Sequence, residues 1–187
     1  MKCSVFIATS VDGFIAKTDG SVDWLHSSGN GKTLPDKHAD MGFNDYITSV
    51  DCMVMGRKCM ETISNMNLTP EQWIYGNLKI IVLSNTLKEA PANLKDKVEM
   101  YSGDIKTLIL NLKNQGYKHA YIDGGTTIQS FINMKMITEM TITKAPILLG
   151  EGIPLFGRIV QPLKLENTKA IAFENDFLQM KYTVNYG

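Results

Sequence analysis

Short hydrophobic runs and amphipathic stretches alternate along the first two thirds of the chain. The hydrophobic runs are rich in Val, Ile and Met and are bounded by Gly, Ser, Asn or Asp, which is typical of buried strands. They predict strands at residues 4–10, 52–55, 79–83, 98–101 and 120–122. The amphipathic stretches repeat their apolar positions at helical spacing and predict helices at residues 36–50, 57–63, 104–115 and 126–132.

The pattern changes after residue 132, where most of the remaining chain reads as strand. Residues 137–147 alternate apolar side chains with Thr, and the tail predicts a hairpin of residues 168–173 and 177–184. The chain contains no internal repeat and no linker. We therefore expect one α/β domain over residues 1–187, with a mostly parallel central sheet, antiparallel C-terminal strands and helices on both faces.

Three segments carry more detailed signals. The helix at 36–50 follows Pro35, a residue favoured at helix starts, and its apolar face comprises Phe43, Tyr46, Ile47 and Val50. Asp104 is placed to cap the helix at 104–115. Residues 19–33 are rich in Gly, Ser and Asn and predict a long loop, a feature that is often functional in a compact domain.

The balance of charges argues against two classes of partner. Lys and Arg number 19, Asp and Glu also number 19, and the formal net charge is zero. Proteins that bind nucleic acid or anionic membranes usually carry a basic excess, and no apolar stretch approaches the ~20 residues of a membrane helix. The three cysteines form no disulfide pattern, and the apolar N-terminus is too short for a secretion signal. We expect a cytoplasmic protein with no nucleic-acid or membrane partner.

Several familiar catalytic motifs are absent. His26, His38 and His119 are scattered without the spacing of metal ligands, so no metal is expected. The chain has no Gly-x-Ser-x-Gly hydrolase motif. Residues 150–152 lack the third glycine of a dinucleotide fingerprint, and residues 31–33 lack the strand that precedes a phosphate-binding loop.

Three junctions at predicted strand ends carry groups suited to phosphate, at residues 54–58, 83–86 and 122–127. A helix that starts at a glycine offers free backbone N–H groups at its positive end, and Arg57 adds a forked cation. Ligands of parallel sheets bind outside the carboxyl ends of the strands. Each junction alone is equally an ordinary turn, but together they predict one long phosphorylated ligand, a dinucleotide.

Five short motifs resemble the dihydrofolate reductase superfamily, in order along nearly the whole chain. Residues 55–63 (MGRKCMETI) resemble the start of its second major helix, and residues 80–84 (IIVLS) resemble its next strand. Residues 122–125 (IDGG) resemble its glycine pair, which carries a cis peptide bond in that family. Residues 8–16 and 148–152 are similar to a subgroup, the reductase domain of riboflavin biosynthesis and its stand-alone bacterial relatives.

The resemblance implies a dihydrofolate reductase-like fold with NADPH as cofactor. Ala8 and Ile15 would pack near the nicotinamide, under a lid at residues 18–24. The residues expected at the phosphates and the adenosine 2′-phosphate are Gly56, Arg57, Lys58, Cys59, Leu83, Ser84 and Asn85. Those expected at the pyrophosphate are Asp123, Gly124, Gly125, Thr126 and Thr127.

Reduction of a C=N bond also needs a proton, which a carboxyl group facing a ring nitrogen can supply. Asp40 lies fifteen residues before Met55, the spacing at which the family places its substrate acid, and Thr143 matches the hydroxyl that partners this acid. Asp40 is alternatively a first-turn acid that favours the helix dipole. Asp12 is the second candidate acid, or else part of an Asp-Gly turn.

Two further residues are candidates for the substrate wall. Trp24 lies in the predicted lid, although packing explains a buried Trp equally well, and Glu151 lies between two glycines, where it is alternatively a solvated loop acid. The family's tail-binding arginine is replaced by Leu78, which disfavours folate itself. We therefore expect a reductase of a pterin- or pyrimidine-like heterocycle, such as 5-amino-6-(5-phosphoribosylamino)uracil. The alternatives are a true dihydrofolate reductase and a non-catalytic nucleotide-binding module, and the subgroup implies a homodimer.

Overall fold

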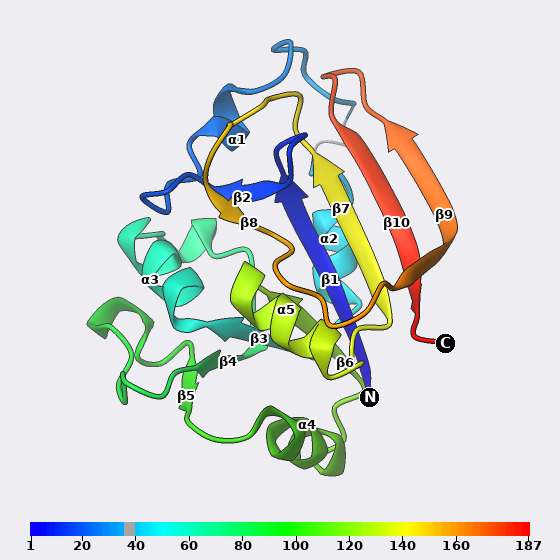
Figure 1. The fold of residues 1–187 in the computed structure, drawn as a ribbon. Coiled ribbons are helices and arrows are strands. Elements are labelled where there is room, and N and C mark those ends of the chain that lie inside the picture. The colour runs from blue at the N-terminus through cyan, green and yellow to red at the C-terminus, as the bar shows by residue number, and fades with distance from the viewer. Residues whose placement is uncertain (36–39) are drawn as a thin grey trace.

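The computed structural model describes residues 1–35 and 40–187 and is built around an eight-stranded sheet with the order β5-β4-β3-β6-β1-β7-β10-β9 (Figure 1). These strands are β1 (Lys2–Thr9), β3 (Cys52–Gly56), β4 (Lys79–Leu83), β5 (Glu99–Tyr101), β6 (His119–Asp123), β7 (Glu139–Lys144), β9 (Lys164–Ala172) and β10 (Leu178–Asn185). A second, two-stranded sheet pairs β2 (Phe14–Ala16) with β8 (Ile153–Pro154). The helices are α1 (Trp24–Ser27), α2 (Phe43–Thr48), α3 (Arg57–Asn65), α4 (Ile105–Asn114) and α5 (Gly125–Asn133), with short 3₁₀ turns η2 (Pro70–Gln72) and η3 (Ala92–Leu94).

Strands β5, β4, β3, β6, β1 and β7 run parallel, and β10 and β9 add to them antiparallel. The mostly parallel sheet with antiparallel C-terminal strands is thereby confirmed. Parallel pairing brings the carboxyl ends of β4, β3, β6 and β1 to one edge of the sheet. The turns that follow these ends therefore share one site.

Helices cover both faces of the sheet, as predicted. Cys52 and Val54 of β3 belong to one hydrophobic cluster, which packs under α4 and α5. Met53 and Met55 of the same strand point the other way, into a second cluster under α2 and α3. This alternation is the two-residue period of a strand that is buried on both sides. The same alternation of side chains determines which residues near the strand ends face α2 and α3.

The predicted helix at 36–50 is shorter in the structure, where α2 begins only at Phe43. Gly42 has φ 84°, a left-handed conformation that does not continue a helix. Its N–H donates to Asp40 Oδ1 at 2.9 Å, and the Asn44 N–H donates to Asp40 Oδ2 at 2.6 Å. Asp40 thus satisfies backbone donors at the start of α2. Residues 36–39 of the predicted range lie outside the described part of the chain.

The remaining predicted helices and central strands are found within a few residues of their expected bounds, and Asp104 caps α4 by accepting from the Thr107 N–H at 2.8 Å. The sequence did not predict α1, β2 or β8, which are too short for a periodic pattern. Helix α1 interrupts the predicted loop at 19–33. One domain over residues 1–187 stays a prediction.

Candidate functional site

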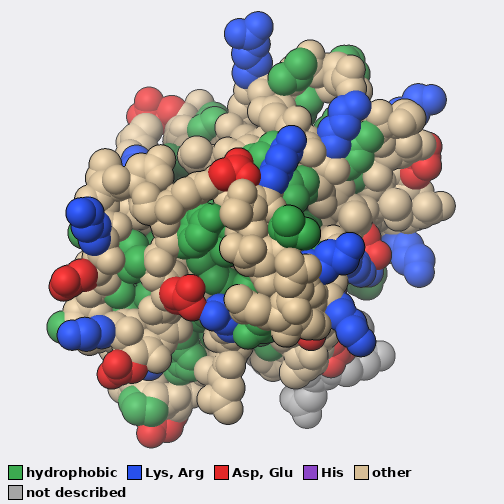
Figure 2. All heavy atoms as spheres, turned by 90° about the horizontal axis from the view of Figure 1, so that it is seen from below, with side chains coloured by type: hydrophobic (Ala, Val, Ile, Leu, Met, Phe, Trp, Pro, Cys, Tyr) green, Lys and Arg blue, Asp and Glu red, His purple; other side chains and the backbone are tan. Residues whose placement is uncertain are grey.

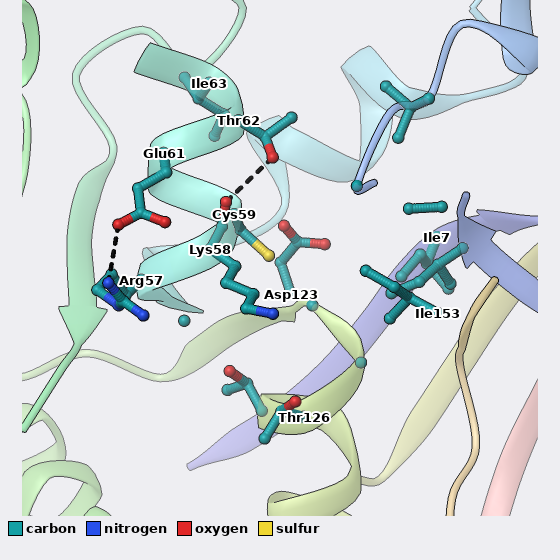
Figure 3. Close-up of a pocket in the computed structure, with 18 of the residues that line it drawn as sticks. Ile7, Arg57, Lys58, Cys59, Glu61, Thr62, Ile63, Asp123, Thr126 and Ile153 are labelled. Carbon is teal, nitrogen blue, oxygen red and sulfur yellow. Dashed lines mark hydrogen bonds and ion pairs between the residues drawn. The ribbon is translucent and has the colours of Figure 1, made fainter. Parts of the chain in front are cut away.

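A cavity of about 1300 Å³ lies at the shared edge of the sheet (Figure 3). The ends of β1, β3, β4 and β6 and the first turns of α3 and α5 line it. It brings together every residue that the sequence suggested for the cofactor, namely Ala8, Ile15, Gly56, Arg57, Lys58, Cys59, Leu83, Ser84, Asn85, Asp123, Gly124, Gly125, Thr126 and Thr127. Their roles toward a cofactor stay predictions, but their meeting in one cavity is a property of the fold.

Two helices begin at this cavity without a side-chain cap. Gly56 precedes α3, Gly124 precedes α5, and neither offers a side chain to the N–H groups of the first turn. Gly124 has φ +88°, and a Cβ on it would meet the Cys59 sulfur. A Cβ on Gly56 would lie 3.1 Å from Thr127 Oγ1, so the two helix starts are close neighbours. Uncapped N–H groups at the positive ends of two helices form a site suited to phosphate.

The cationic side chains of the described cavity lining are Arg57 and Lys58, both in the first turn of α3. Arg57 Nη1 lies 3.1 Å from Glu61 Oε1 in an i,i+4 ion pair that is partly exposed. Such exposed pairs contribute little to stability, so Arg57 can exchange this partner for a ligand at a small cost. Figure 3 shows Arg57 and Lys58 on α3 and Thr126 on α5, with the cavity between the two helices.

Asp123 is an acid at the base of the cavity, at the end of β6. The Tyr121 hydroxyl lies 3.3 Å from its Oδ1 atom, and the Cys59 thiol hydrogen-bonds to the same carboxyl group. Removal from bulk water raises the pKa of Asp123 above its ordinary value, and hydrogen bonds from Gly124, Tyr121 and Cys59 oppose that rise. No cation forms an ion pair with Asp123 within the described residues. The protein therefore holds a carboxyl group that keeps its proton more readily than usual.

The sequence analysis placed Asp123 among the cofactor residues and missed it as an acid. The signal was an acidic residue between a buried apolar strand and a glycine pair. Its environment comes from separate segments, since Cys59 belongs to α3 and Tyr75 follows η2. Burial also raises the pKa of the Cys59 thiol, so this cysteine is a neutral group.

Aromatic rings form the wall of the cavity on the side of α2 and α3. Phe6 from β1, Phe43 from α2, Tyr75 and Tyr121 all line it. The Phe6 and Phe43 rings lie edge to face, with centroids 5.6 Å apart. The Tyr121 hydroxyl donates to the Phe6 carbonyl oxygen at 3.0 Å. This wall suits a flat ring system.

Asp40 does not line the cavity. Its carboxylate accepts the N–H groups of Gly42 and Asn44, and these hydrogen bonds, led by the one from Asn44, lower its pKa. A carboxylate with a lowered pKa is a poor proton donor at neutral pH. The structure thus places Asp40 as a helix-start acid, the alternative reading of the sequence.

Asp12 and Glu151 also lie outside the cavity. The Asp12 carboxylate accepts the N–H groups of Leu149 at 3.2 Å and Gly150 at 2.8 Å. Hydrogen bonds, first from Ser10 and then from Gly150 and Leu149, lower the pKa of Asp12. Asp12 therefore holds the turn at residues 149–150, while Glu151 is exposed beside it.

Thr143 and Trp24 are buried beyond the cavity lining. Thr143 Oγ1 accepts from Gln179 Nε2 at 3.0 Å, and the same amide donates to the Met41 carbonyl at 2.9 Å. Thr143 thus connects β7 to β10 and to the segment before α2. Trp24 is 2% exposed and packs in a third hydrophobic cluster with Phe173 and Phe177.

The cis peptide bond that the resemblance implied is not found. The described residues contain none, so the bond between Gly124 and Gly125 is trans. Over residues 1–35 and 40–187, no three His, Cys, Asp or Glu side chains cluster as metal ligands would. None of the helices in those ranges is long and apolar enough to cross a membrane. On the face seen in Figure 2, basic and acidic side chains are interspersed, in keeping with the zero net charge.

Comparison with known proteins places this geometry in context. The family model described as the RibD C-terminal domain matches residues 2–179. The uncharacterized protein YwjB of Bacillus subtilis (strain 168) is 32% identical over 167 residues, which cover 88% of this chain and 87% of YwjB. A solved structure from Shewanella sp. PV-4, described as a riboflavin biosynthesis protein, is 38% identical and superposes with a TM-score of 0.87 over 99% of both chains. Dihydrofolate reductase from Enterococcus faecalis, solved with NADP(H), shares the fold with a TM-score of 0.61 at 16% identity, over 98% of this chain and 96% of the other.

Proposed function

The chain belongs to the RibD C-terminal domain family, and on that premise we propose that it is an NADPH-dependent reductase of a pterin- or pyrimidine-like heterocycle. The membership confirms the resemblance seen in the sequence motifs. The proposed activity is of the 5-amino-6-(5-phosphoribosylamino)uracil reductase type. One observation carries the proposal: a single cavity joins two uncapped helix starts, two cations and a carboxyl group with a raised pKa.

The residues present fit NADPH. The N–H groups that follow Gly56 and Gly124 lack side-chain caps and suit the pyrophosphate oxygens. Arg57 and Lys58 supply positive charge beside them, and Arg57 offers the forked geometry that matches a phosphate. Ala8 and Ile15 form an apolar end to the cavity, where a nicotinamide ring would pack. Bound there, the cofactor would supply a hydride to the substrate.

The chain's own contribution is to orient the substrate and to hold a proton. The rings of Phe6, Phe43 and Tyr121 bound the space beside the apolar end of the cavity. Asp123 lines the cavity, and its raised pKa keeps a proton available for the nitrogen of a C=N bond whose carbon would accept the hydride. Residues 18–22 also line the cavity and would exclude water once a substrate is bound.

Each of two alternative functions predicts a result that differs measurably from this proposal. A non-catalytic module would bind NADPH without oxidising it. A true dihydrofolate reductase would bind the glutamate tail of folate, but Leu78, at the position of the tail-binding arginine, packs against the second hydrophobic cluster and offers no cation. Dihydrofolate should therefore be a poor substrate.

The experiment is a panel assay with pure protein. Binding of NADPH and NADH is measured first by calorimetry, and oxidation of NADPH is then followed at 340 nm with dihydrofolate, oxidised pterins, lumazine and substituted aminouracils. Turnover of any heterocycle other than dihydrofolate supports the proposal. Binding of NADPH with no turnover across the panel favours the non-catalytic module, and absence of binding removes the proposed function.

We also propose that the protein acts in the cytoplasm as a homodimer formed through its C-terminal strands. All of β9 is exposed, and Leu165 and Ile171 on this edge strand are 41% and 46% exposed. An uncovered edge strand with apolar side chains can pair with a second copy. Light scattering after size exclusion measures the mass, and Ile171→Lys should convert a dimer to a monomer. A monomeric wild type would contradict this proposal.

A further inference from the structure

The substrate half of the cavity is aromatic. Phe6 and Tyr121 form its floor on the sheet, Phe43 faces them from α2, and Tyr75 and Ile63 complete the wall. Tyr46 supports this floor from behind, with its ring centroid 4.8 Å from that of Phe6 and 5.2 Å from that of Tyr121. These interlocked rings form a rigid apolar slot suited to a flat π system.

Among the described residues, the cations that line the cavity lie in its other half. In the part of the cavity lining that the structure describes, the cations are Arg57 and Lys58, which belong to the phosphate-binding start of α3. The acids in the same lining are Asp19, Glu61 and Asp123. The three pyridine-nucleotide phosphates would engage both cations. A second phosphorylated molecule would then find no described cation left to pair with it, and the Asp19 carboxylate, whose pKa is lowered by hydrogen bonds from Ser21, adds a negative charge to the lining.

Within the described residues, the start of α2 offers no free donor in place of a cation. Its Gly42 and Asn44 N–H groups are already bound by the Asp40 carboxylate. Hydrogen bonds lower the pKa of Asp40, so this carboxylate stays charged at neutral pH. An anion at this helix start would meet a negative charge.

Resting on the proposed reductase function, we propose that the substrate is a flat, uncharged heterocycle without a phosphate group. Stacking on the Phe6, Phe43 and Tyr121 rings supplies the affinity, and Asp123 is the polar group that orients the ring. The phosphoribosyl compound that the family resemblance suggested is then a poor ligand, and its dephosphorylated form is a better one.

The test uses three probes that share one ring: 5,6-diaminouracil, 5-amino-6-(ribosylamino)uracil and the 5′-phosphate of the latter. Each is titrated calorimetrically into the wild-type protein, with and without saturating NADP⁺. Because like charges oppose binding, the phosphate should weaken binding at least about ten-fold relative to the ribosylamino compound, with the larger difference when NADP⁺ is present. The bare ring should bind as well as the ribosylamino compound within about three-fold.

A gain-of-charge variant makes the test specific to this cavity. Met66 lines the cavity at the end of α3 and is 47% exposed, so Met66→Lys adds a cation with little strain. It should improve binding of the 5′-phosphate and leave the bare ring unchanged, whereas Met66→Gln should improve neither. Leu110→Lys is the control for net charge, because Leu110 lies on α4, outside the cavity lining, and is 56% exposed. It should leave the ratio of affinities for the ribosylamino compound and its 5′-phosphate as in the wild type.

The outcomes separate this inference from the proposed function. Equal or tighter wild-type binding of the 5′-phosphate overturns the inference and leaves the reductase proposal standing. Binding of NADP⁺ with no binding of any of the three rings also overturns it. Failure to bind NADP⁺ removes the proposed function. The affinities of the ribosylamino compound and its 5′-phosphate, measured without nucleotide, still show whether the aromatic half of the cavity disfavours a phosphate.

Discussion

Tyr121 and Asp123 lie on the same side of β6, with the Tyr121 hydroxyl oxygen 3.3 Å from Asp123 Oδ1 and 3.0 Å from the Phe6 carbonyl oxygen. The single hydroxyl proton of Tyr121 thus has two acceptors within reach, the Phe6 carbonyl and the Asp123 carboxyl group. Burial raises the pKa of Asp123, and the hydrogen bond from Tyr121 opposes that rise without cancelling it.

Asp123→Asn is expected to reduce kcat by roughly 10²- to 10⁴-fold, the usual contribution of a positioned general acid. The amide keeps the shape but has no acidic proton to give. Because the protonated form is the active one, wild-type kcat should fall as pH rises through the raised pKa of Asp123, and this dependence should disappear in the variant. Steady-state kinetics across pH, with the Kd of NADPH measured in parallel, checks both points.

Asp40→Asn is the matched control for this variant. Asp40 accepts two N–H groups at the start of α2, one on each oxygen, and lies outside the cavity lining. Because an amide has one acceptor oxygen, the replacement loses one of these hydrogen bonds and should lower stability by about 0.5–1.5 kcal/mol. The pH dependence of kcat should remain that of the wild type. Loss of the dependence in Asp40→Asn but not in Asp123→Asn would return Asp40 to the role of catalytic acid.

Arg57→Ala is expected to weaken NADPH by roughly 10- to 150-fold, corresponding to the ~1.5–3 kcal/mol of a charged hydrogen bond. NADH lacks the 2′-phosphate and should be weakened far less. Glu61→Gln serves as the control, because it frees Arg57 from its 3.1 Å ion pair and should leave NADPH binding equal or tighter. Calorimetry with both nucleotides measures the ratio, and equal losses for NADPH and NADH would place Arg57 away from the 2′-phosphate.

Gly124→Ala is expected to destabilise the fold by at least about 1–2 kcal/mol, because φ +88° disfavours any side chain and the new methyl group meets the Cys59 sulfur. The double variant with Cys59→Ala should recover part of this loss, since it removes the clash and leaves the backbone strain. Urea denaturation of the four proteins in this cycle gives the coupling free energy. Full additivity would show that the two residues do not meet.

His119 should make stability depend on pH. Its Nδ1 atom donates to the Ser49 carbonyl at 2.8 Å, which leaves Nε2 to accept from Ser4 Oγ at 2.7 Å. Burial lowers the pKa of His119 below 6.5 despite the nearby acids Glu139 and Asp51. The folded pKa lies below the unfolded one, so the contribution is complete above pH 6.5 and is lost as pH falls through the lowered value.

The free energy of unfolding, measured in urea at pH 7.5 and pH 5, tests this prediction. The wild type should lose more stability between the two values than His119→Gln, which cannot titrate. Buried and capped carboxyl groups contribute equally to both proteins and cancel in the comparison. Parallel losses in the two proteins would assign the acid sensitivity to groups other than His119.

The glycine turns that line the cavity were predictable because their signals are local. Gly56 with Arg57, and Gly124 with Gly125, each follow a buried strand directly, and parallel pairing then brings the strand ends together. The substrate half was not predictable in this way. Asp40 was chosen by its spacing to Met55. That spacing does not reveal that the left-handed Gly42 delays the start of α2 to Phe43, or that the Asp40 carboxylate accepts backbone N–H groups there.

The acidity of Asp123 depends on residues that are distant in sequence. Burial raises its pKa, and its neighbours Cys59 and Tyr75 come from other segments that only the fold brings to it. Trp24 is a similar case, because its partners Phe173 and Phe177 come from the C-terminal hairpin. Packing was one of the two readings of Trp24 in the sequence, but the polar loop around it gave no sign of which residues it packs against.

Strands β3 and β6 are each hydrogen-bonded to a neighbour on both sides, so the glycine turns at their ends are fixed by the interior of the sheet. Phe43 and Tyr75, by contrast, are carried on separate surface segments outside that sheet. If the proposed function holds, replacement of either segment during evolution would change which compound is reduced, while the source of reducing equivalents would stay the same.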